Sequence, residues 1–149
     1  MLNDIFSPNR IKNLSGTTKD DVLEELIETI TDSKPECDHR ELFDAVHMRE
    51  SKMHTIIKPG IAVPRGYCSN INGVIGAIGF SREGIEYDDP DSGSQQPVHL
   101  VFLLIMDEVS REKHLRVLSR LLEMLNSPAF SRLKSSKNPD DFYKVLNSF

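Results

Sequence analysis

Apolar side chains recur at helical spacing in the first quarter of the chain. Thr18, with Asp21 behind it, resembles a capping box, and an apolar stripe follows it. The stripe predicts a helix that ends at Pro35. A second helix should begin near Asp38 and fade over residues 49–52. The expected inward positions of the two helices are Val22, Leu23, Leu26, Ile27, Ile30, Leu42, Phe43, Val46 and Met48.

The middle of the chain changes to strand-like patterning. We expect a leader with an edge strand at residues 10–14, and then further strands at residues 60–63, 73–80, 85–87 and 98–106. Residues 85–87 would form the hairpin return of the strand before them. Polar, turn-rich runs predict loops at residues 65–72 and 88–97. The nearly unbroken apolar run 98–106 is typical of a central strand covered on both faces.

The last third returns to helical spacing. Ser110 should cap a helix whose predicted core face is Leu115, Leu118, Leu121, Leu122 and Leu125. Two short helices should follow, at residues 129–134 and 139–147. This order of strands and helices favours an α/β fold, namely a three-layer α/β/α sandwich with a mixed central β-sheet, in a single domain over residues 1–149.

Composition narrows the functional classes. The 149 residues are 38% hydrophobic and 28% charged, with a formal net charge of -5. This acidic balance argues against a broad nucleic-acid surface, and the apolar runs are too short for membrane insertion. The start lacks the pattern of a signal peptide, so we expect a cytoplasmic protein. Cys37 and Cys68 have no metal-ligand spacing and are interpreted as ordinary thiols; no metal and no cofactor is predicted.

The most specific motif is the run 49–66, RESKMHTIIKPGIAVPRG. It resembles the signature of type-2 EIIA domains of the phosphoenolpyruvate-dependent sugar phosphotransferase system, the fructose, mannitol and nitrogen-regulatory group. The closest part of the resemblance is Gly60, Ile61, Ala62, Val63 and Pro64. Similar patterns near the start of the chain and around residues 99–122 extend the resemblance over nearly the whole sequence.

The resemblance implies a phosphoryl relay and a set of site residues. In this family an HPr-like phosphocarrier donates a phosphoryl group to a histidine, which passes it to an EIIB cysteine. Here Arg65 stands at the phosphoacceptor position, His114 matches the second histidine and Arg49 matches the arginine near the phosphoryl site. Thr55 also falls in register with the signature, while two of its glycines are replaced in residues 55–58.

Arginine at position 65 changes the expected chemistry. Phosphoryl transfer needs an unprotonated nitrogen as nucleophile, which imidazole supplies near neutral pH. A guanidinium stays protonated and has no acceptor, but it pairs well with oxyanions. We therefore assign no catalytic residue. We expect instead a small site for an anion or partner that includes Arg49, Thr55, Arg65 and His114.

Two functions remain open from the sequence. One is a regulatory module that binds an HPr-like phosphocarrier or regulatory targets such as a kinase or a transporter. The other is an active phosphocarrier that uses His114 or His54 as acceptor. The cytoplasmic part of a transporter is a third possibility, because bicarbonate transporters share this fold family. The sequence does not define the oligomeric state.

Overall fold

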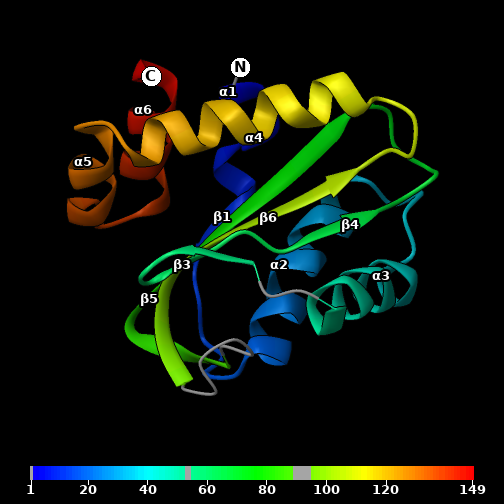
Figure 1. Cartoon of the computed structure of the whole chain (residues 1–149), viewed down its shortest axis with the longest axis horizontal. Coiled ribbons are helices and arrows are strands. Elements are labelled where there is room, and N and C mark those ends of the chain that lie inside the picture. Colours follow the sequence, from blue (N-terminus) through cyan, green and yellow to red (C-terminus); the bar gives the residue numbers. More distant parts are fainter. Residues whose placement is uncertain (1, 53–54, 89–94) are drawn as a thin grey trace.

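A computed structural model describes residues 2–52, 55–88 and 95–149. Figure 1 shows a central sheet with helices on both of its faces, which is the expected three-layer α/β/α arrangement. Within the described residues, no helix has the length and apolar character needed to cross a membrane.

The sheet is mixed, as predicted. Its strands are β1 (Ile11–Asn13), β2 (Ile56–Lys58), β3 (Ile61–Ala62), β4 (Arg65–Tyr67), β5 (Val74–Asp88) and β6 (Gln95–Met106). The strand order is β1-β5-β6-β3-β2, and β4 pairs with the C-terminal part of β6. The β5–β6 and β2–β3 pairs are antiparallel and the β1–β5, β3–β6 and β4–β6 pairs are parallel.

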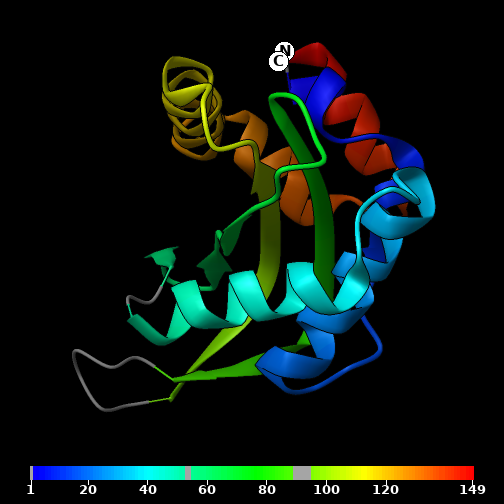
Figure 2. The same ribbon diagram turned by 90° about the vertical axis from the view of Figure 1, so that its right-hand side faces the viewer.

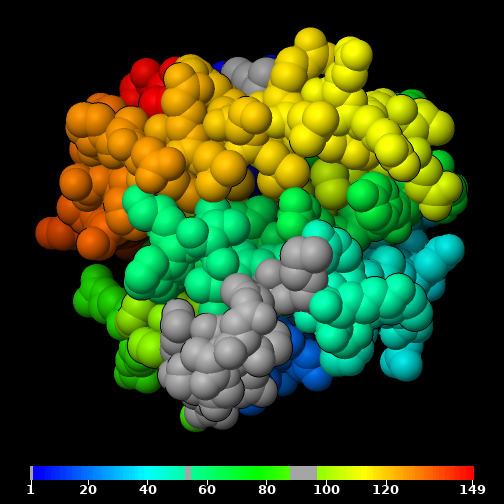
Figure 3. Space-filling view, in the orientation of Figure 1, coloured from blue at the N-terminus to red at the C-terminus, as the bar shows by residue number. Residues whose placement is uncertain are grey.

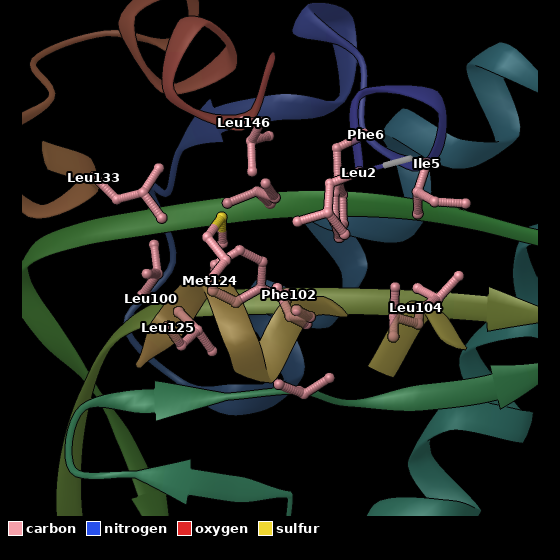
Figure 4. Close-up of a cluster of buried hydrophobic side chains, with 14 of the residues drawn as sticks. Leu2, Ile5, Phe6, Leu100, Phe102, Leu104, Met124, Leu125, Leu133 and Leu146 are labelled. Atoms are coloured by element: carbon pink, nitrogen blue, oxygen red, sulfur yellow. The ribbon is translucent and has the colours of Figure 1, made fainter. Parts of the chain in front are cut away.

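Strand β6 is the central strand that the apolar run predicts, and it separates two cores. Its side chains alternate between the faces, because successive residues of a strand point to opposite sides. Val101, Leu103 and Ile105 enter the core on one face. The core on the other face, shown in Figure 4, receives Leu100, Phe102, Leu104 and Met106.

Helices α2 (Lys19–Ser33) and α3 (His39–Lys52) cover the first face. The Thr18 hydroxyl accepts a hydrogen bond from the Asp21 amide at 3.2 Å, and the Asp38 carboxylate accepts one from the Glu41 amide at 3.1 Å. These two caps satisfy amides that a helix leaves without intrahelical partners. The predicted helix starts are thus confirmed.

Helices α1 (Leu2–Ile5), α4 (Arg111–Leu125), α5 (Ala129–Ser135) and α6 (Pro139–Ser148) cover the second face, as Figure 2 shows from the side. A short 3-10 helix, η1 (Pro8–Arg10), leads into β1. The two termini lie close together, and the side-chain Nδ2 of Asn3 donates a hydrogen bond to Oδ1 of Asn147 at 2.9 Å. The predicted C-terminal helices are confirmed, whereas α1 and η1 were expected only as a leader.

Two strand predictions were wrong. Residues 65–72 were expected to be a loop, but Arg65–Tyr67 forms β4 by pairing in parallel with β6. Residues 85–87 were expected to return as a hairpin, but β5 continues to Asp88 through an irregularity between Phe80 and Ile85. The return strand is β6, and the centre of the predicted loop 88–97 lies outside the described residues.

Three predicted core positions are instead exposed. The exposed fractions are 60% for Met48, 65% for Leu115 and 41% for Leu122. The buried face of α4 is made by His114, Val117, Leu121, Met124 and Leu125. Helix α4 therefore presents a different stripe to the sheet, and part of the predicted core stripe faces outward.

The two cysteines lie in contact beneath the α2–α3 turn. Their Sγ atoms are 3.5 Å apart, and both thiols are free and buried. Burial, with the neighbouring Cys68, raises the pKa of Cys37 to about 12. The Cys37 thiol is therefore protonated and unreactive near neutral pH.

Candidate anion and partner-binding site

A cavity of about 340 Å³ opens beside the C-terminal end of β6. Its walls come from the end of α3, from β4 and from the first turns of α4. The lining side chains are Arg49, Arg65, Tyr67, Met106, Arg111, His114, Leu115 and Leu118. Three arginines line this cleft, whereas the whole chain carries a net charge of -5.

Close packing against α3 holds Arg65 in place. Arg65 pairs with Leu104 and Gly66 with Ile105 in the parallel ladder between β4 and β6. A Cβ atom on Gly66 would lie 2.7 Å from Cγ2 of Val46, so only glycine allows this strand to approach the helix. The backbone of β4 is therefore fixed on both sides, and Arg65 projects from a rigid support.

The guanidinium of Arg65 is half-buried and has no hydrogen-bond acceptor among the described residues. Its Nε is a buried donor without a partner. Burial and the neighbouring Arg49 charge lower the pKa of Arg65, because both disfavour its cation. An unpaired buried donor lowers the stability of the folded chain, and a guanidinium is suited to pair with an oxyanion.

A buried carboxylate lies near this cation. Glu50 is 4% exposed and accepts a hydrogen bond from the hydroxyl of Thr55, while its Oε2 has no partner among the described residues. Burial raises the pKa of Glu50, although Thr55, Lys19, Arg49 and Arg65 act against this rise. Burial and the Glu50 charge raise the pKa of the Tyr87 hydroxyl well above its usual range.

Asp107 organises the other wall of the cleft. Its carboxylate accepts hydrogen bonds from the amides of Gly73 and Ser110 and from the Ser110 hydroxyl. These bonds, led by the one from Gly73, hold the pKa of Asp107 below its usual range. Nε2 of His114 lies 3.1 Å from Asp107 Oδ1 and donates to it, because a carboxylate can only accept.

The bond to Asp107 therefore orients the buried His114 ring and occupies its Nε2, so that Nδ1 is the ring nitrogen not used in this bond. The residue is 7% exposed, and its ring packs at a tilt of 49° against Tyr67, with centroids 6.2 Å apart. The ring lies in the first turns of α4, where the helix dipole favours an anion.

Apolar side chains surround the cationic cleft. Tyr67 and Leu115 are 50% and 65% exposed, and both line the cavity together with the partly buried Leu118. Two further exposed apolar side chains are Val109, in the loop before α4, and Leu122, within α4. Exposed apolar groups around a charged centre are typical of a surface that binds another protein.

The structure brings Arg49, Arg65 and His114 into one cleft, as the motif register leads us to expect. Thr55 does not line the cleft, because it is buried and bonded to Glu50. His54 lies outside the described residues. Among those that are described, no group of histidine, cysteine, aspartate and glutamate could hold a metal ion.

Sequence reasoning missed Arg111 and Asp107. Arg111 precedes His114 by one helical turn, and that spacing alone could have indicated a shared face. Asp107 directly follows the buried strand and precedes Ser110 by three residues, which could have indicated a carboxylate that caps α4.

The mixed sheet between helical layers and the basic cleft beside β6 define an EIIA-type domain. The family model described as "Phosphoenolpyruvate-dependent sugar phosphotransferase system, EIIA 2" matches residues 4–149. The chain belongs to this family.

The relatives with curated names include a fructose-specific component and a nitrogen regulatory protein. The chain is 28% identical to the "PTS system fructose-specific EIIABC component" of Bacillus subtilis over 98% of its own length, but it spans only 23% of that protein. It is 29% identical to the "Nitrogen regulatory protein" of Pseudomonas aeruginosa, with 97% of this chain and 94% of that protein covered.

Solved structures agree on the fold. The nitrogen regulatory protein IIA-Ntr from Neisseria meningitidis superposes with a TM-score of 0.84 at 25% identity, covering 97% of this chain and 98% of that one. Enzyme IIAMTL from Escherichia coli, solved in complex with phosphorylated enzyme IIBMTL, superposes with a TM-score of 0.74 at 18% identity, covering 97% and 99%. The second likeness supports the fold alone.

Proposed function

We propose that this chain is a regulatory, partner-binding EIIA-type module that does not accept phosphate at position 65. The observation that carries the proposal is the half-buried guanidinium of Arg65, which lines a cleft with two further arginines and has no acceptor among the described residues. Such a group cannot act as a nucleophile, but it is suited to bind an oxyanion.

The ligand is best supplied by another protein. The cationic centre would bind a carboxylate or a phosphoryl group, and the apolar rim of Tyr67, Leu115 and Leu118 would cover the surrounding surface of the partner. An HPr-like phosphocarrier is the first candidate partner, and regulatory targets such as a kinase or a transporter are the others. The proposal assigns the chain to the cytoplasm.

A phosphocarrier that uses a different histidine is the second candidate function. His114 lies in the cleft and keeps Nδ1 available, since its Nε2 is bonded to Asp107. Its burial next to three arginines would favour an incoming phosphoryl group but restrict the approach of a donor. His54 remains an acceptor by sequence position only.

A phosphorylation assay separates the two functions. The purified chain is incubated with phosphoenolpyruvate, the general phosphotransferase enzyme and an HPr-like phosphocarrier, and its intact mass is then measured. We expect no phosphoryl adduct. An adduct that disappears in His114→Asn or in His54→Asn would overturn the regulatory function and establish the phosphocarrier.

A binding assay tests the role of the cleft directly. Calorimetry with the HPr-like phosphocarrier should show that Arg65→Met weakens binding by about tenfold or more, because a charge-assisted contact is lost. Arg116→Met is the matched control, since Arg116 is an exposed arginine of α4 that does not line the cleft. Equal affinities for both variants would contradict the assignment of Arg65.

A further inference from the structure

A second and larger cavity, of about 400 Å³, lies between helices α5 and α6 and the middle of the β5–β6 pair. Its apolar walls are Phe80, Leu100, Leu133 and Phe142. The rings of Phe80 and Phe142 stack face to face, with centroids 5.1 Å apart and planes 8° apart; Phe142 is buried, and Phe80 is the half-buried ring of the pair. The space-filling view of Figure 3 shows this side of the molecule, where orange α5 meets the green end of the sheet.

The mouth of this cavity is cationic. Arg82, Lys134 and Lys137 line it together with His99, and none of the aspartates and glutamates that the structure describes does. Within the described parts of the chain, none of Arg82, Lys134 and Lys137 has a carboxylate partner, and the Lys134 ammonium lies 5.3 Å from the centroid of the Phe130 ring. The chain as a whole is acidic, with 23 acidic and 18 basic residues, whereas the charged side chains at this mouth are basic.

His99 is held in a defined orientation at the mouth. Its Nδ1 donates to the carbonyl oxygen of Ser81 at 2.9 Å, since that oxygen can only accept. The backbone amide of His99 is also bonded, at 2.8 Å, to the carbonyl oxygen of Gly60. The ring is therefore fixed before any ligand arrives, and Nε2 is left to interact.

This cavity is separate from the Arg65 cleft. Leu100 lines one and Met106 lines the other, and both residues belong to β6. At roughly 3.3 Å per residue, the six steps between them span about 20 Å. The two lining sets have no described residue in common, so the second cavity is not an extension of the first.

We propose that this cavity is a binding site for a small organic anion with a flat apolar body. The flat body would lie against the half-buried Phe80 ring, which Phe142 supports by stacking, and its acidic group would pair with Arg82 and Lys137 at the mouth. The volume falls within the roughly 300–1,000 Å³ typical of small-molecule sites. An apolar floor with a few charged groups at its edge is the usual construction of such sites.

The experiment compares two fluorescent probes of similar shape on the full chain. Anilinonaphthalene sulfonate carries an anionic group, and N-phenylnaphthylamine is its neutral counterpart. The test variant is Arg82→Glu with Lys137→Glu. The control variant is Lys113→Glu with Arg116→Glu, which makes the same charge change at two exposed residues that do not line the cavity.

We expect the test variant to weaken binding of the sulfonate probe by about tenfold or more, while binding of the neutral probe changes by less than about threefold. The control variant should bind both probes as the original chain does. Unchanged sulfonate binding in the test variant would overturn the proposal. An equal loss of both probes, or an equal loss in the control, would also overturn it.

Displacement then defines the acidic group. Naphthoate and naphthyl phosphate should each displace the sulfonate probe from the original chain, and the stronger competitor identifies a carboxylate or a phosphate ligand. Failure of both to displace it would overturn the proposal. Near-ultraviolet circular dichroism of each variant verifies that the fold is intact, so that a change in probe binding reports on the site.

Discussion

Arg10 and Arg65 are both half-buried, and burial lowers the pKa of each, but their surroundings differ. Arg10 donates to the carbonyl oxygens of Gly76 and Ile5 at 3.0 and 3.1 Å and to the hydroxyl of Ser33 at 3.3 Å. Arg65 has no acceptor among the described residues, and its Nε is buried. The same side chain thus donates a hydrogen bond from each of its three nitrogens in one region and has no acceptor among the described residues in the other.

This difference separates an arginine that is bonded within the fold from one that the proposed function assigns to a ligand. Arg10 joins α1, α2 and β5, so its hydrogen bonds form on folding. The Nε of Arg65 loses water on folding without gaining a partner among the described residues, which costs free energy. The contrast predicts a large loss of stability when Arg10 is replaced and little or no loss when Arg65 is replaced.

Replacing Arg10 should have the largest effect. Arg10→Met keeps much of the apolar stem but removes the donors to the Gly76 and Ile5 carbonyls. We expect the free energy of unfolding to fall by about 2–4 kcal/mol in urea denaturation. Arg40→Met, at an exposed ion pair of α3, is the control and should change stability by less than about 0.5 kcal/mol. A loss no larger than that of the control would contradict the structural role of Arg10.

The next effect concerns the support of Arg65. Gly66→Ala places a Cβ atom 2.7 Å from Cγ2 and 3.3 Å from the backbone nitrogen of Val46. We expect a loss of about 1–3 kcal/mol in the free energy of unfolding, because β4 must move away from α3. The same shift should weaken phosphocarrier binding, which calorimetry would detect. Unaltered stability and affinity together would show that β4 is not held by this contact.

Asp107 should make the cleft region sensitive to acid. Its pKa is lowered in the folded state, so the stability it contributes is present above the unfolded value of about 3.9 and is lost as the pH falls through the folded value. Asp107→Asn should therefore be less stable than the original chain at neutral pH, with a difference that shrinks below about pH 4. Thermal melts from pH 2 to 7 measure this. Parallel curves across that range would refute it.

Replacing Arg65 should have the smallest effect on stability. Arg65→Met removes a half-buried cation without an acceptor, so the free energy of unfolding should stay within about 0.5 kcal/mol or rise by up to about 1 kcal/mol. The same urea denaturation used for Arg10 gives a direct comparison. A loss as large as that of Arg10→Met would mean that Arg65 stabilises the fold and is not reserved for a ligand.

The sequence predicted the elements that have strong local signals. Apolar spacing, capping residues and helix-breaking residues predict the capped helix α2, the apolar strand β6 and the short helices α5 and α6. Strand β4 has no such signal, because Arg-Gly-Tyr is not a strand-forming run by itself. It forms because its backbone pairs with β6 and Gly66 fits against Val46.

The candidate site was predicted only in part for the same reason. The motif register places Arg49 and Arg65, but it cannot show that the guanidinium of Arg65 lacks an acceptor. The apolar residues of α4 can be grouped into more than one stripe along the helix. The stripe that packs against the sheet is the one that contains His114. As a result Leu115 and Leu122 remain exposed, and Leu115 lines the cleft.

Strand β6 contributes a residue to each of the two cavities. Because it is hydrogen-bonded on both sides and buried on both faces, it behaves as a stiff spacer of fixed length. A small molecule in one cavity cannot reach the other across about 20 Å. The two proposed sites therefore lie far enough apart for a protein partner and a small anion to bind at the same time without competing for space.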